Sequence, residues 1–466
     1  MKTQNIPPNV SNFVKSLRDI GYTLEIAVAD ILDNSISANA NHIQIYAAPN
    51  PKMIFCIFDN GNGMTEDELI EAMRLSSKSP HDVRDEKDLG KFGLGLKTAS
   101  FSQCKKLTVL SKQNNIISIK QWDLDYIADK NDWLLITPDL SDFKNIPLLD
   151  ELNNTGTGTL VVWQNIDNYE ENFSESVNKV RQHLSLVFHR FLEDSFNRLK
   201  ISLNGNNLTP LNPFNIVHSA TQEKPLETIR IGNSEIKISP YVLPHHSKVS
   251  QKEWERHETE DGYIKSQGFY LYRAKRLLIY GTWWGMHKAI DAHKLVRIKI
   301  DIPNSQDEYW GIDVKKSHAK PREDIKKRLK VIINKSTEIG SRPYTGRGRA
   351  IKDKTITKFW QTIPIDNNFR FGLNKAHPLY QKIKTSLGEN FELLDIYLKG
   401  LEAYLPLEAI QAHLQSNPCK IKQETALSEG DIKSLASQLR KQGLSDEYIT
   451  SLLKTEIFKN NKELLK

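Results

Sequence analysis

Four short polar or glycine-rich segments, which follow one another in a fixed order between residues 30 and 159, restrict the fold of this chain more than any other feature. They are Asp30-x-x-x-Asn34 inside a helical pattern, DNGNGM at the end of a strand pattern, LGKFGLGLK before a helix, and GT at the start of a strand. Each segment lies at or beside a boundary between regular elements. We therefore expect the four segments to line one pocket in an α+β domain.

The apolar periodicity around these segments predicts the elements of that domain. Helical spacing covers residues 22–38, and strands follow at residues 42–46 and 53–58. Thr65 and Glu68 form a capping-box pattern that begins another helix. Further strands are predicted at residues 105–112, 116–122, 132–137 and 158–163, and a helix at residues 175–192. Short connections between these strands favour a mixed, mainly antiparallel sheet with helices on one face.

The rest of the chain predicts two further regions. Asn-Gly and Gly-Asn turns indicate hairpins in residues 201–208 and 227–238, and strands at 268–280 and 294–302 precede a helix at 322–339. A stretch rich in Gly, Pro and Arg follows as a linker, and the residues from 380 onward are mainly helical. The predicted domains are therefore residues 1–200, residues 201–340, and residues 341–466 as linker plus helical region.

Two residues of the first helical segment are candidates for chemistry. The i, i+4 spacing places Asp30 and Asn34 on one helix face. Asn34 offers a hard oxygen of the kind that Mg²⁺ binds, and Asp30 has a carboxylate that can deprotonate an attacking water. A solvated polar helix face explains the same residues when they are considered alone.

The other segments add candidates for binding a base and phosphates. Asp59 ends a strand, where its carboxylate can accept a hydrogen bond from an adenine amino group, and an ordinary turn is the competing interpretation. The N–H groups of the third segment, at a helix start, can cradle phosphates. Thr159 offers a hydroxyl near the base. The residues assigned to cofactor binding are Asn34, Asp59, Gly61, Gly63, Met64, Gly90, Lys91, Phe92, Gly93, Leu94, Gly95, Leu96, Lys97 and Thr159.

The four segments together resemble the motifs of the Bergerat-fold ATPases, the superfamily of gyrase B, the ninety-kilodalton chaperones, histidine kinases and MutL. The resemblance implies a Bergerat-fold domain that binds ATP and Mg²⁺, with Asn34 at the metal, Asp59 at the adenine, and residues 90–96 at the phosphates. It also implies Asp30 as the general base. MutL and gyrase have glutamate at that position, so the shorter aspartate predicts slow hydrolysis.

The second region is similar to the ribosomal-protein-like α+β transducer domain of gyrase and MutL. Such a domain sends a lysine to the terminal phosphate, which stabilises charge during phosphoryl transfer. In WGIDVKKSH the candidates are Lys315 and Lys316, and the sequence does not choose between them. A solvated basic patch is the alternative interpretation.

The segments GFYLYRAKRLLIYGTWWG and IDVKKSHAKP are most similar to bacterial relatives of MORC ATPases. This resemblance implies an ATP-gated homodimer that works as a switch or clamp on double-stranded DNA, in restriction or anti-phage defence, with a nuclease or other defence component as partner protein. Two other functions stay open: a chaperone-like remodeller of a protein partner, and a regulatory module that binds nucleotide without turnover. Stimulation of ATP hydrolysis by DNA distinguishes the first from the second, and phosphate release distinguishes it from the third.

Composition limits the remaining classes. No apolar run is long enough to cross a bilayer, and the first ten residues lack the apolar stretch of a secretory signal, so a cytoplasmic location is expected. A formal charge of +7 permits contact with nucleic acid without indicating it. The basic stretches at residues 315–330 and 341–354 are candidates for phosphate contact, although a solvated helix face and a linker explain each stretch better when it is considered alone.

Overall fold

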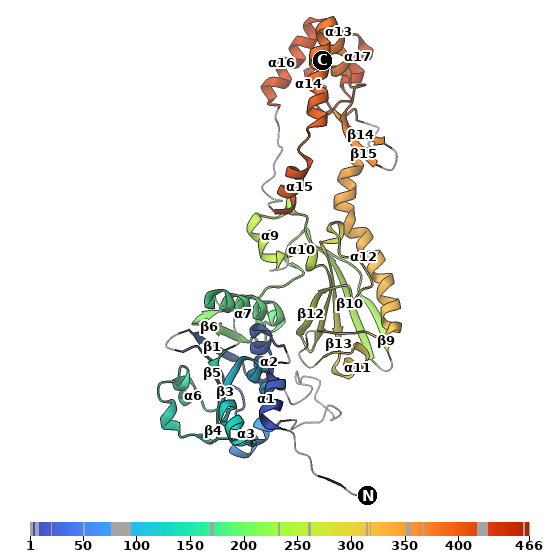
Figure 1. Cartoon of the computed structure of the whole chain (residues 1–466). Coiled ribbons are helices and arrows are strands. Elements are labelled where there is room, and N and C mark those ends of the chain that lie inside the picture. Colours follow the sequence, from blue (N-terminus) through green and yellow to red (C-terminus); the bar gives the residue numbers. More distant parts are fainter. Residues whose placement is uncertain are drawn as a thin grey trace. The chain divides into compact units, whose positions relative to one another are not determined.

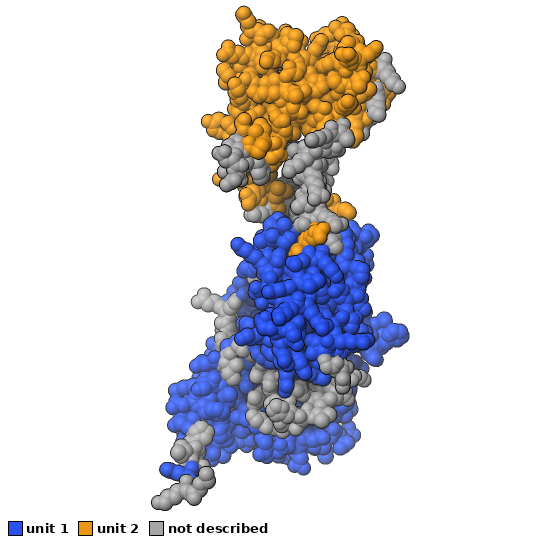
Figure 2. Space-filling model, turned by 90° about the vertical axis from the view of Figure 1, so that its right-hand side faces the viewer, with its two compact units in different colours: residues 1–243, 257–336 blue, residues 244–256, 337–466 orange. Residues whose placement is uncertain are grey.

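The computed structural model describes residues 3–4, 9–19, 21–49, 52–75, 95–167, 172–231, 234–259, 262–313, 316, 318–350, 356–365, 368–416, 427–459 and 462–465. These residues form two compact units, which Figure 2 shows in blue and orange. The first unit comprises residues 1–243 and 257–336, and the second comprises residues 244–256 and 337–466. The first unit contains two sheets, so the two sheet-containing domains expected from the sequence fall within one unit; their boundary near residue 200 stays a prediction.

The first sheet has the strand order β4-β3-β5-β2-β1-β6-β7. Its neighbouring strands are antiparallel except β1 and β6, which are parallel, so the prediction of a mixed, mainly antiparallel sheet is confirmed. The strands are β1 (His42–Ala48), β2 (Ile54–Asp59), β3 (Cys104–Gln113), β4 (Ile116–Asp123), β5 (Gly158–Ile166), β6 (Lys200–Leu203) and β7 (Asn206–Asn207).

One face of this sheet carries the main helices of the first unit (Figure 1). The large core between them includes Val28, Ile57, Val109 and Leu184, in which apolar residues of helices and strands interdigitate. The helices that precede or follow the strands are α1 (Val10–Arg18), α2 (Leu24–Ser37), α3 (Glu66–Met73), α4 (Gly95–Gln103), α5 (Leu124–Lys130), α7 (Phe173–Val187) and α8 (His189–Leu192).

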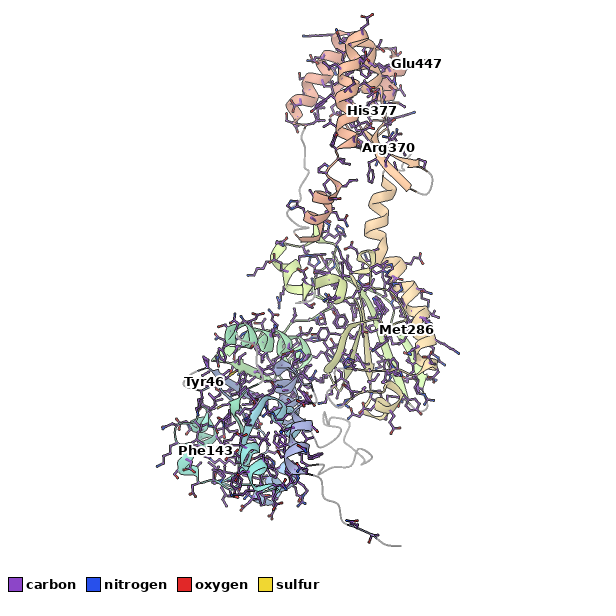
Figure 3. All side chains as sticks on the ribbon, viewed as in Figure 1. Tyr46, Phe143, Met286, Arg370, His377 and Glu447 are labelled. Carbon is purple, nitrogen blue, oxygen red and sulfur yellow. The ribbon has the colours of Figure 1, made fainter. Side chains whose placement is uncertain are left out.

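The opposite face of the sheet is covered in part as well. A smaller core there includes Cys56 and Leu160 from the sheet, together with Phe143 and Leu149 from the short helices η1 (Leu140–Phe143) and α6 (Leu149–Asn154). Phe143 is labelled in Figure 3. Helices on a single face were expected, and the segment between β4 and β5 adds this second layer.

Helix α2 is buried on almost every side. Its apolar residues at positions 27–29, 31 and 32 are all buried, and so are Asp30, Asp33 and Ser35. A helix that is buried all round belongs to the interior of a domain. Because a buried carboxylate is costly unless a cation or hydrogen bonds compensate it, α2 must find partners for both aspartates.

The start of α3 confirms the capping box. The Thr65 side chain accepts a hydrogen bond from the backbone N–H of Glu68, and the Thr65 backbone N–H donates to Glu68 Oε2 at 2.8 Å. The strand expected at residues 132–137 is wrong. Only Ile136 forms a β-bridge, to Gln121, while Trp133 and Leu135 pack against the main core. An apolar run that serves as a covering segment has the same composition as a strand.

The second sheet has the order β12-β11-β13-β10-β8, and β9 also pairs with β10. The β9–β10 hairpin confirms the predicted turn, whereas residues 268–280, which were predicted as strand throughout, are divided into the hairpin β11–β12. The strands are β8 (Gln222–Glu223), β9 (Glu227–Ile231), β10 (Ser234–Val242), β11 (Gly268–Arg273), β12 (Arg276–Thr282) and β13 (Val296–Ile302). The same part of the first unit contains α10 (Gly262–Lys265), η3 (Asp291–His293), η4 (Asn304–Gln306) and α11 (Asp307–Trp310), whereas η2 (His246–Lys248) and most of α9 (Gln251–Glu258) belong to the second unit. The core of this sheet includes the buried residues Ile298, Trp310 and Leu329, and Met286, labelled in Figure 3, packs against it.

Helix α12 (Glu323–Ala350) is longer than expected. The sequence predicted its end near residue 339 and a linker beyond it, but residues 340–350 continue the helix. Glycine and proline weaken a helix without forbidding it: Pro343 removes one backbone N–H and leaves the remaining hydrogen bonds possible.

The second unit is mainly helical, as expected, with an additional hairpin. The hairpin consists of β14 (Trp360–Ile365) and β15 (Asn368–Leu373). A small core includes Leu379, Leu439, Leu452 and Phe458. Its helices are α13 (Pro378–Leu387), η5 (Gly388–Asn390), α14 (Phe391–Ala403), α15 (Leu407–Ser416), α16 (Glu429–Lys441), α17 (Asp446–Leu452) and η6 (Lys462–Leu464). No helix in the described part of the chain is both long enough and apolar enough to cross a membrane.

Candidate nucleotide site

The sheet register brings the second and fourth sequence segments together. In the antiparallel pair β2–β5, Asp59 lies opposite Thr159, and in the pair β3–β5, Thr159 lies opposite Ser111. The hydroxyls of Ser111 and Thr159 are 3.0 Å apart, and Ser111 Oγ also accepts a hydrogen bond from the backbone N–H of Met64 at 2.9 Å. Three adjacent strands therefore place a carboxylate and two hydroxyls in one row.

Asp59 is held in a fixed position. Ser35 of α2 donates a hydrogen bond to Oδ2 at 2.7 Å, and the backbone N–H of Gly61 donates to Oδ1 at 2.9 Å. Burial raises the pKa of the Asp59 carboxyl, against the effect of both hydrogen bonds. Helix α2 therefore orients the proposed adenine contact through Ser35, a residue that the sequence analysis did not single out.

The glycines of DNGNGM allow the turn to pack closely against neighbouring backbone. Gly63 has a φ of +66°, and a Cβ at this position would lie 2.0 Å from the carbonyl oxygen of Lys112 on β3. Only glycine fits such a close approach of two backbones. A Cβ at Gly61 would lie 2.8 Å from the carbonyl oxygen of Ala38, just beyond α2. These two glycines therefore pack the turn against β3 and against the end of α2.

The first and third segments also meet. A Cβ built on Gly95, the first residue of α4, would lie 3.8 Å from Asp30 Oδ2. Leu96 is half-buried against the main core. Residues 90–94 of the proposed phosphate loop lie outside the described residues, namely Gly90, Lys91, Phe92, Gly93 and Leu94.

Lys97 is buried in the first turn of α4. Its Nζ donates a hydrogen bond to the carbonyl oxygen of Ala72 in α3 at 2.9 Å, and burial lowers its pKa to about 8. This contact ties α4 to α3, which is a structural role that the sequence did not suggest for the last residue of the loop.

The two buried aspartates of α2 receive their partners from the second sheet region. Lys316 donates to Asp30 Oδ1 at 3.1 Å and to Asp33 Oδ2 at 2.6 Å. Arg276, at the start of β12, donates from Nε to Asp33 Oδ1 at 3.0 Å. All four side chains are at most 9% exposed. The ion pairs therefore join the helix of the first sheet to the strand and loop of the second.

The turn that carries Lys316 aims this lysine. Lys316 has a φ of +56°, and its backbone N–H donates to the carbonyl oxygen of Asp313 at 3.1 Å. The backbone N–H of His318 donates to the Asp313 carboxylate at 3.0 Å. A lysine in left-handed backbone conformation is unfavourable unless its surroundings hold it there, and such strain is frequent at functional sites. Lys315, the alternative candidate, lies outside the described residues.

The environments of the two aspartates push their pKa values apart. Burial alone would raise the pKa of Asp33, but the charges of Arg276 and Lys316 outweigh it and lower the pKa. For Asp30, burial outweighs the effect of Lys316 and raises the pKa. Pairs of carboxyls whose pKa values diverge in this way are typical of sites that assign one group to proton transfer.

Tyr22 completes the surroundings of Asp30. Its hydroxyl donates to Asp30 Oδ2 at 3.0 Å, so each oxygen of the Asp30 carboxylate has a partner. Burial raises the pKa of Tyr22 above its ordinary value, which keeps the hydroxyl a donor. Tyr22 begins the helical pattern seen in the sequence, but nothing in that pattern marked it as a site residue.

Asn34 differs from its neighbours because it is exposed. Its Nδ2 donates to the carbonyl oxygen of Asp30, one helical turn earlier, at 3.2 Å. A carboxamide that faces solvent one turn from a buried carboxylate fits a single protein ligand of Mg²⁺, which keeps several waters and binds few protein groups. The structure thus separates a buried, acidic half of the site from an exposed half.

A hollow of about 1520 Å³ lies at another place in the first unit, beyond the end of α2. Its lining includes Asn39, Asn60, Phe196 and Lys275, and none of the residues assigned to nucleotide binding. Asn60 uses its side-chain oxygen to accept hydrogen bonds from the backbone N–H groups of Asn41 and His42. This hollow therefore does not coincide with the residues that the sequence predicts for the nucleotide site.

Comparisons with known proteins agree with the geometry. Residues 22–159 match the family described as histidine kinase-, DNA gyrase B-, and HSP90-like ATPase. The chain is 30% identical to ATPase MORC2B of Mus musculus over 96 residues and 27% identical to ATPase morc-1 of Caenorhabditis elegans over 108 residues. These matches cover 20% and 23% of this chain but only 9% and 12% of the two relatives.

The matched residues contain Asp30, Asn34, Asp59 and Thr159, together with α2, β1, β2, β3, β4 and the start of β5. The second sheet and the second unit lie outside the match. Residues 22–159 are therefore a domain of the histidine kinase-, DNA gyrase B- and HSP90-like ATPase family, and part of the chain is similar to MORC ATPases.

Proposed function

We propose that the chain is an ATP-gated switch, which binds ATP with magnesium, hydrolyses it slowly, and closes as a homodimer on DNA. The observation that carries this proposal is the ion-pair cluster in which Lys316 reaches across to Asp30 and Asp33 of α2. Lys316, from the region of the second sheet, thus forms an ion pair with Asp30, the candidate general base in the region of the first sheet. A ligand that binds Lys316 and removes it from Asp30 and Asp33 therefore changes the charge environment of the candidate base. It also breaks one contact between the two sheet regions.

The site supports the following roles. Asp59 accepts a hydrogen bond from the adenine amino group, with Thr159 beside it, and the exposed Asn34 would hold magnesium, which neutralises charge on the phosphates. Asp30 accepts the proton of the attacking water as the water oxygen bonds to the γ-phosphorus and the bond from that phosphorus to the leaving ADP breaks, and Asp30 then releases the proton to solvent and is ionised again. The raised pKa of Asp30 suits that role.

Lys316 makes the switch sensitive to the γ-phosphate. A buried lysine leaves two carboxylates only for another anion, because an unpaired charge in the interior is strongly unfavourable. The γ-phosphate of ATP is such an anion, and ADP lacks it. With Lys316 on the phosphate, Asp30 loses one of its two partners and becomes free to accept a proton. Arg276 keeps Asp33 paired throughout, which holds α2 against β12 during the exchange.

We expect Lys316→Ala to lower turnover by roughly 10²- to 10³-fold, the usual effect of removing one group that stabilises transition-state charge. Adenine binding should be largely spared, because Asp59 and Thr159 do not contact Lys316. Steady-state phosphate release and ADP affinity measure the two effects. Lys288→Ala removes an exposed lysine and serves as the control. Equal loss of ADP and ATP binding in Lys316→Ala would show that the variant damages the domain instead.

Helix α12 supports the DNA part of the proposal. Its buried stripe includes Ile325 and Leu329, while Lys327, Arg328 and Lys330 are exposed. Exposed cations on one helix bind the phosphate backbone without sequence preference. Duplex DNA should therefore raise the rate of phosphate release, and the effect should weaken with salt. A rate that duplex DNA leaves unchanged would remove DNA from the proposal. The resemblance to bacterial relatives of MORC ATPases adds restriction or anti-phage defence as the proposed setting.

A second function has one observation in its favour. Both oxygens of Asp30 are engaged, by Lys316 and Tyr22, which is what a module that binds nucleotide without turnover would also show. Phosphate release distinguishes the two functions. Release that stays at background with saturating ATP, magnesium and DNA would establish the module.

A further inference from the structure

Helix α14 has an apolar surface much wider than the part that the second unit covers. Among the described residues, the hydrogen bonds, ion pairs and ring contacts between α14 and the rest of the chain lie on one side of the helix. Phe391 packs edge-to-face against Tyr380 of α13, Asp395 accepts a hydrogen bond from the Tyr380 hydroxyl at 2.7 Å, and Glu402 accepts one from the backbone N–H of Leu373 at 2.9 Å. At 100° per residue, positions 391, 395 and 402 share one face of the helix.

The opposite face is apolar and exposed. Leu393, Ile396, Tyr397, Leu401 and Tyr404 are 78, 59, 64, 47 and 86% exposed. Leu393, Tyr397, Gly400 and Tyr404 follow one another at steps of four, three and four residues, the heptad spacing of a coiled-coil seam. Exposed apolar surface that is continuous in this way marks an interaction site on a soluble protein.

We infer that this face, named here the α14 seam and defined as Leu393, Tyr397, Gly400 and Tyr404, binds the same seam of a second copy in antiparallel orientation. In that arrangement, two residues meet when their numbers add to 797. Tyr397 then packs over Gly400 of the other copy, and Leu393 packs against Tyr404 of the other copy. Such an interface is self-complementary, as two-fold symmetry requires.

Gly400 argues for an identical partner. A glycine inside a helix costs about 1 kcal/mol relative to alanine, and a Cβ at Gly400 would meet no atom within 4 Å. The packing of this chain therefore does not require the glycine. The seam contains a large side chain, Tyr397, and three residues later a glycine, Gly400, which leaves space for the Tyr397 side chain of a second copy. No charged residue stands in the exposed arc, so nothing in it repels an identical face.

Helix α15 extends the exposed surface. Leu407, Ile410 and Leu414 are exposed at steps of three and four residues. Together, α14, its C-cap residue Tyr404 and α15 present eight large apolar side chains. A stable interface buries roughly 800 Å² on each partner, which takes more than one short helix. The dimer is independent of nucleotide, so this inference does not depend on the proposed ATPase activity.

Sedimentation of the full chain without nucleotide tests the inference. Wild type should have the mass of a dimer. Leu393→Lys and Tyr404→Glu should each be monomers, because either places a charge in the apolar seam. Ile116→Lys changes an exposed apolar residue of the β3–β4 hairpin and should remain a dimer. Circular dichroism should be unchanged in all variants, since neither seam residue belongs to the buried core.

Mixing the two monomeric variants tests the register. When Leu393→Lys and Tyr404→Glu are combined, one contact pairs lysine with glutamate and the symmetric contact keeps Leu393 against Tyr404, so dimers should form again. A monomeric wild type would overturn the inference, and so would a Leu393→Lys variant that stays a dimer. Variants that remain monomers after mixing would overturn the antiparallel register.

Discussion

Replacing Asn34 with alanine is expected to abolish magnesium-dependent ATP binding. Asn34 is the exposed residue of α2 next to the buried Asp33 and Ser35, and its carboxamide oxygen is the proposed protein ligand of the metal. Loss of one interaction with a charged group costs about 1.5–3 kcal/mol, which corresponds to roughly 10- to 150-fold in affinity. Because the metal also bridges the phosphates, further contacts should be lost with it.

Titration calorimetry with ATP in the presence of magnesium measures this effect. Asn154→Ala, at the exposed end of α6, provides the matched control and should bind like wild type. Since Asn34 lies on the surface, its loss should leave the fold intact. Wild-type affinity in Asn34→Ala would rule out Asn34 as the metal ligand.

Asp30→Asn should bind ATP and lose turnover by roughly 10²- to 10⁴-fold, the contribution of a general base. An amide cannot accept the proton from water. It can still accept a hydrogen bond from Lys316 or Tyr22 through its oxygen, so the surroundings of α2 should persist. Single-turnover phosphate release compares the variant with wild type.

Asp129→Asn is the control for this change, because the side chain of Asp129 is 73% exposed. The variant should keep full turnover. Undiminished hydrolysis in Asp30→Asn would transfer the role of base to another group. Hydrolysis absent from wild type as well would favour the nucleotide-binding module.

The sequence could predict those parts of the fold that depend on local pattern. The capping box at Thr65 and Glu68 is a local exchange of two hydrogen bonds, and it forms as expected. The β9–β10 hairpin follows from its Gly-Asn turn, but the turn inside residues 268–280 was missed because Ala-Lys is not a typical turn pair. The strand predicted at residues 132–137 was wrong because an apolar run that covers a core has the same composition as one that joins a sheet.

The residues of the candidate site also fall into those that the sequence could single out and those that it could not. Asp30, Asn34 and Asp59 belong to short motifs with fixed spacing, so the sequence could single them out. The pair of Asp33 and Arg276 joins residues 243 positions apart, and nothing local to Arg276 distinguishes it from other basic residues of the chain. Lys316 was one of two candidates in the sequence, and its contact with α2 depends on a left-handed backbone conformation that no sequence pattern marks.

In the proposed switch, the γ-phosphate moves the molecule between two states. Only a ligand with different affinities for two conformations shifts their equilibrium. Converting a mostly open population into a mostly closed one requires a preference of about 5 kcal/mol. Several charge-assisted hydrogen bonds, gained together when Lys316 moves from Asp30 and Asp33 to the phosphate, can supply that preference.

Small-angle scattering of the full chain with saturating magnesium and a non-hydrolysable ATP analogue, compared with ADP, distinguishes the two states. We expect a closed dimer with a smaller radius of gyration in the analogue, and the nucleotide-free radius in ADP. An analogue that leaves both mass and radius unchanged would contradict the proposed switch.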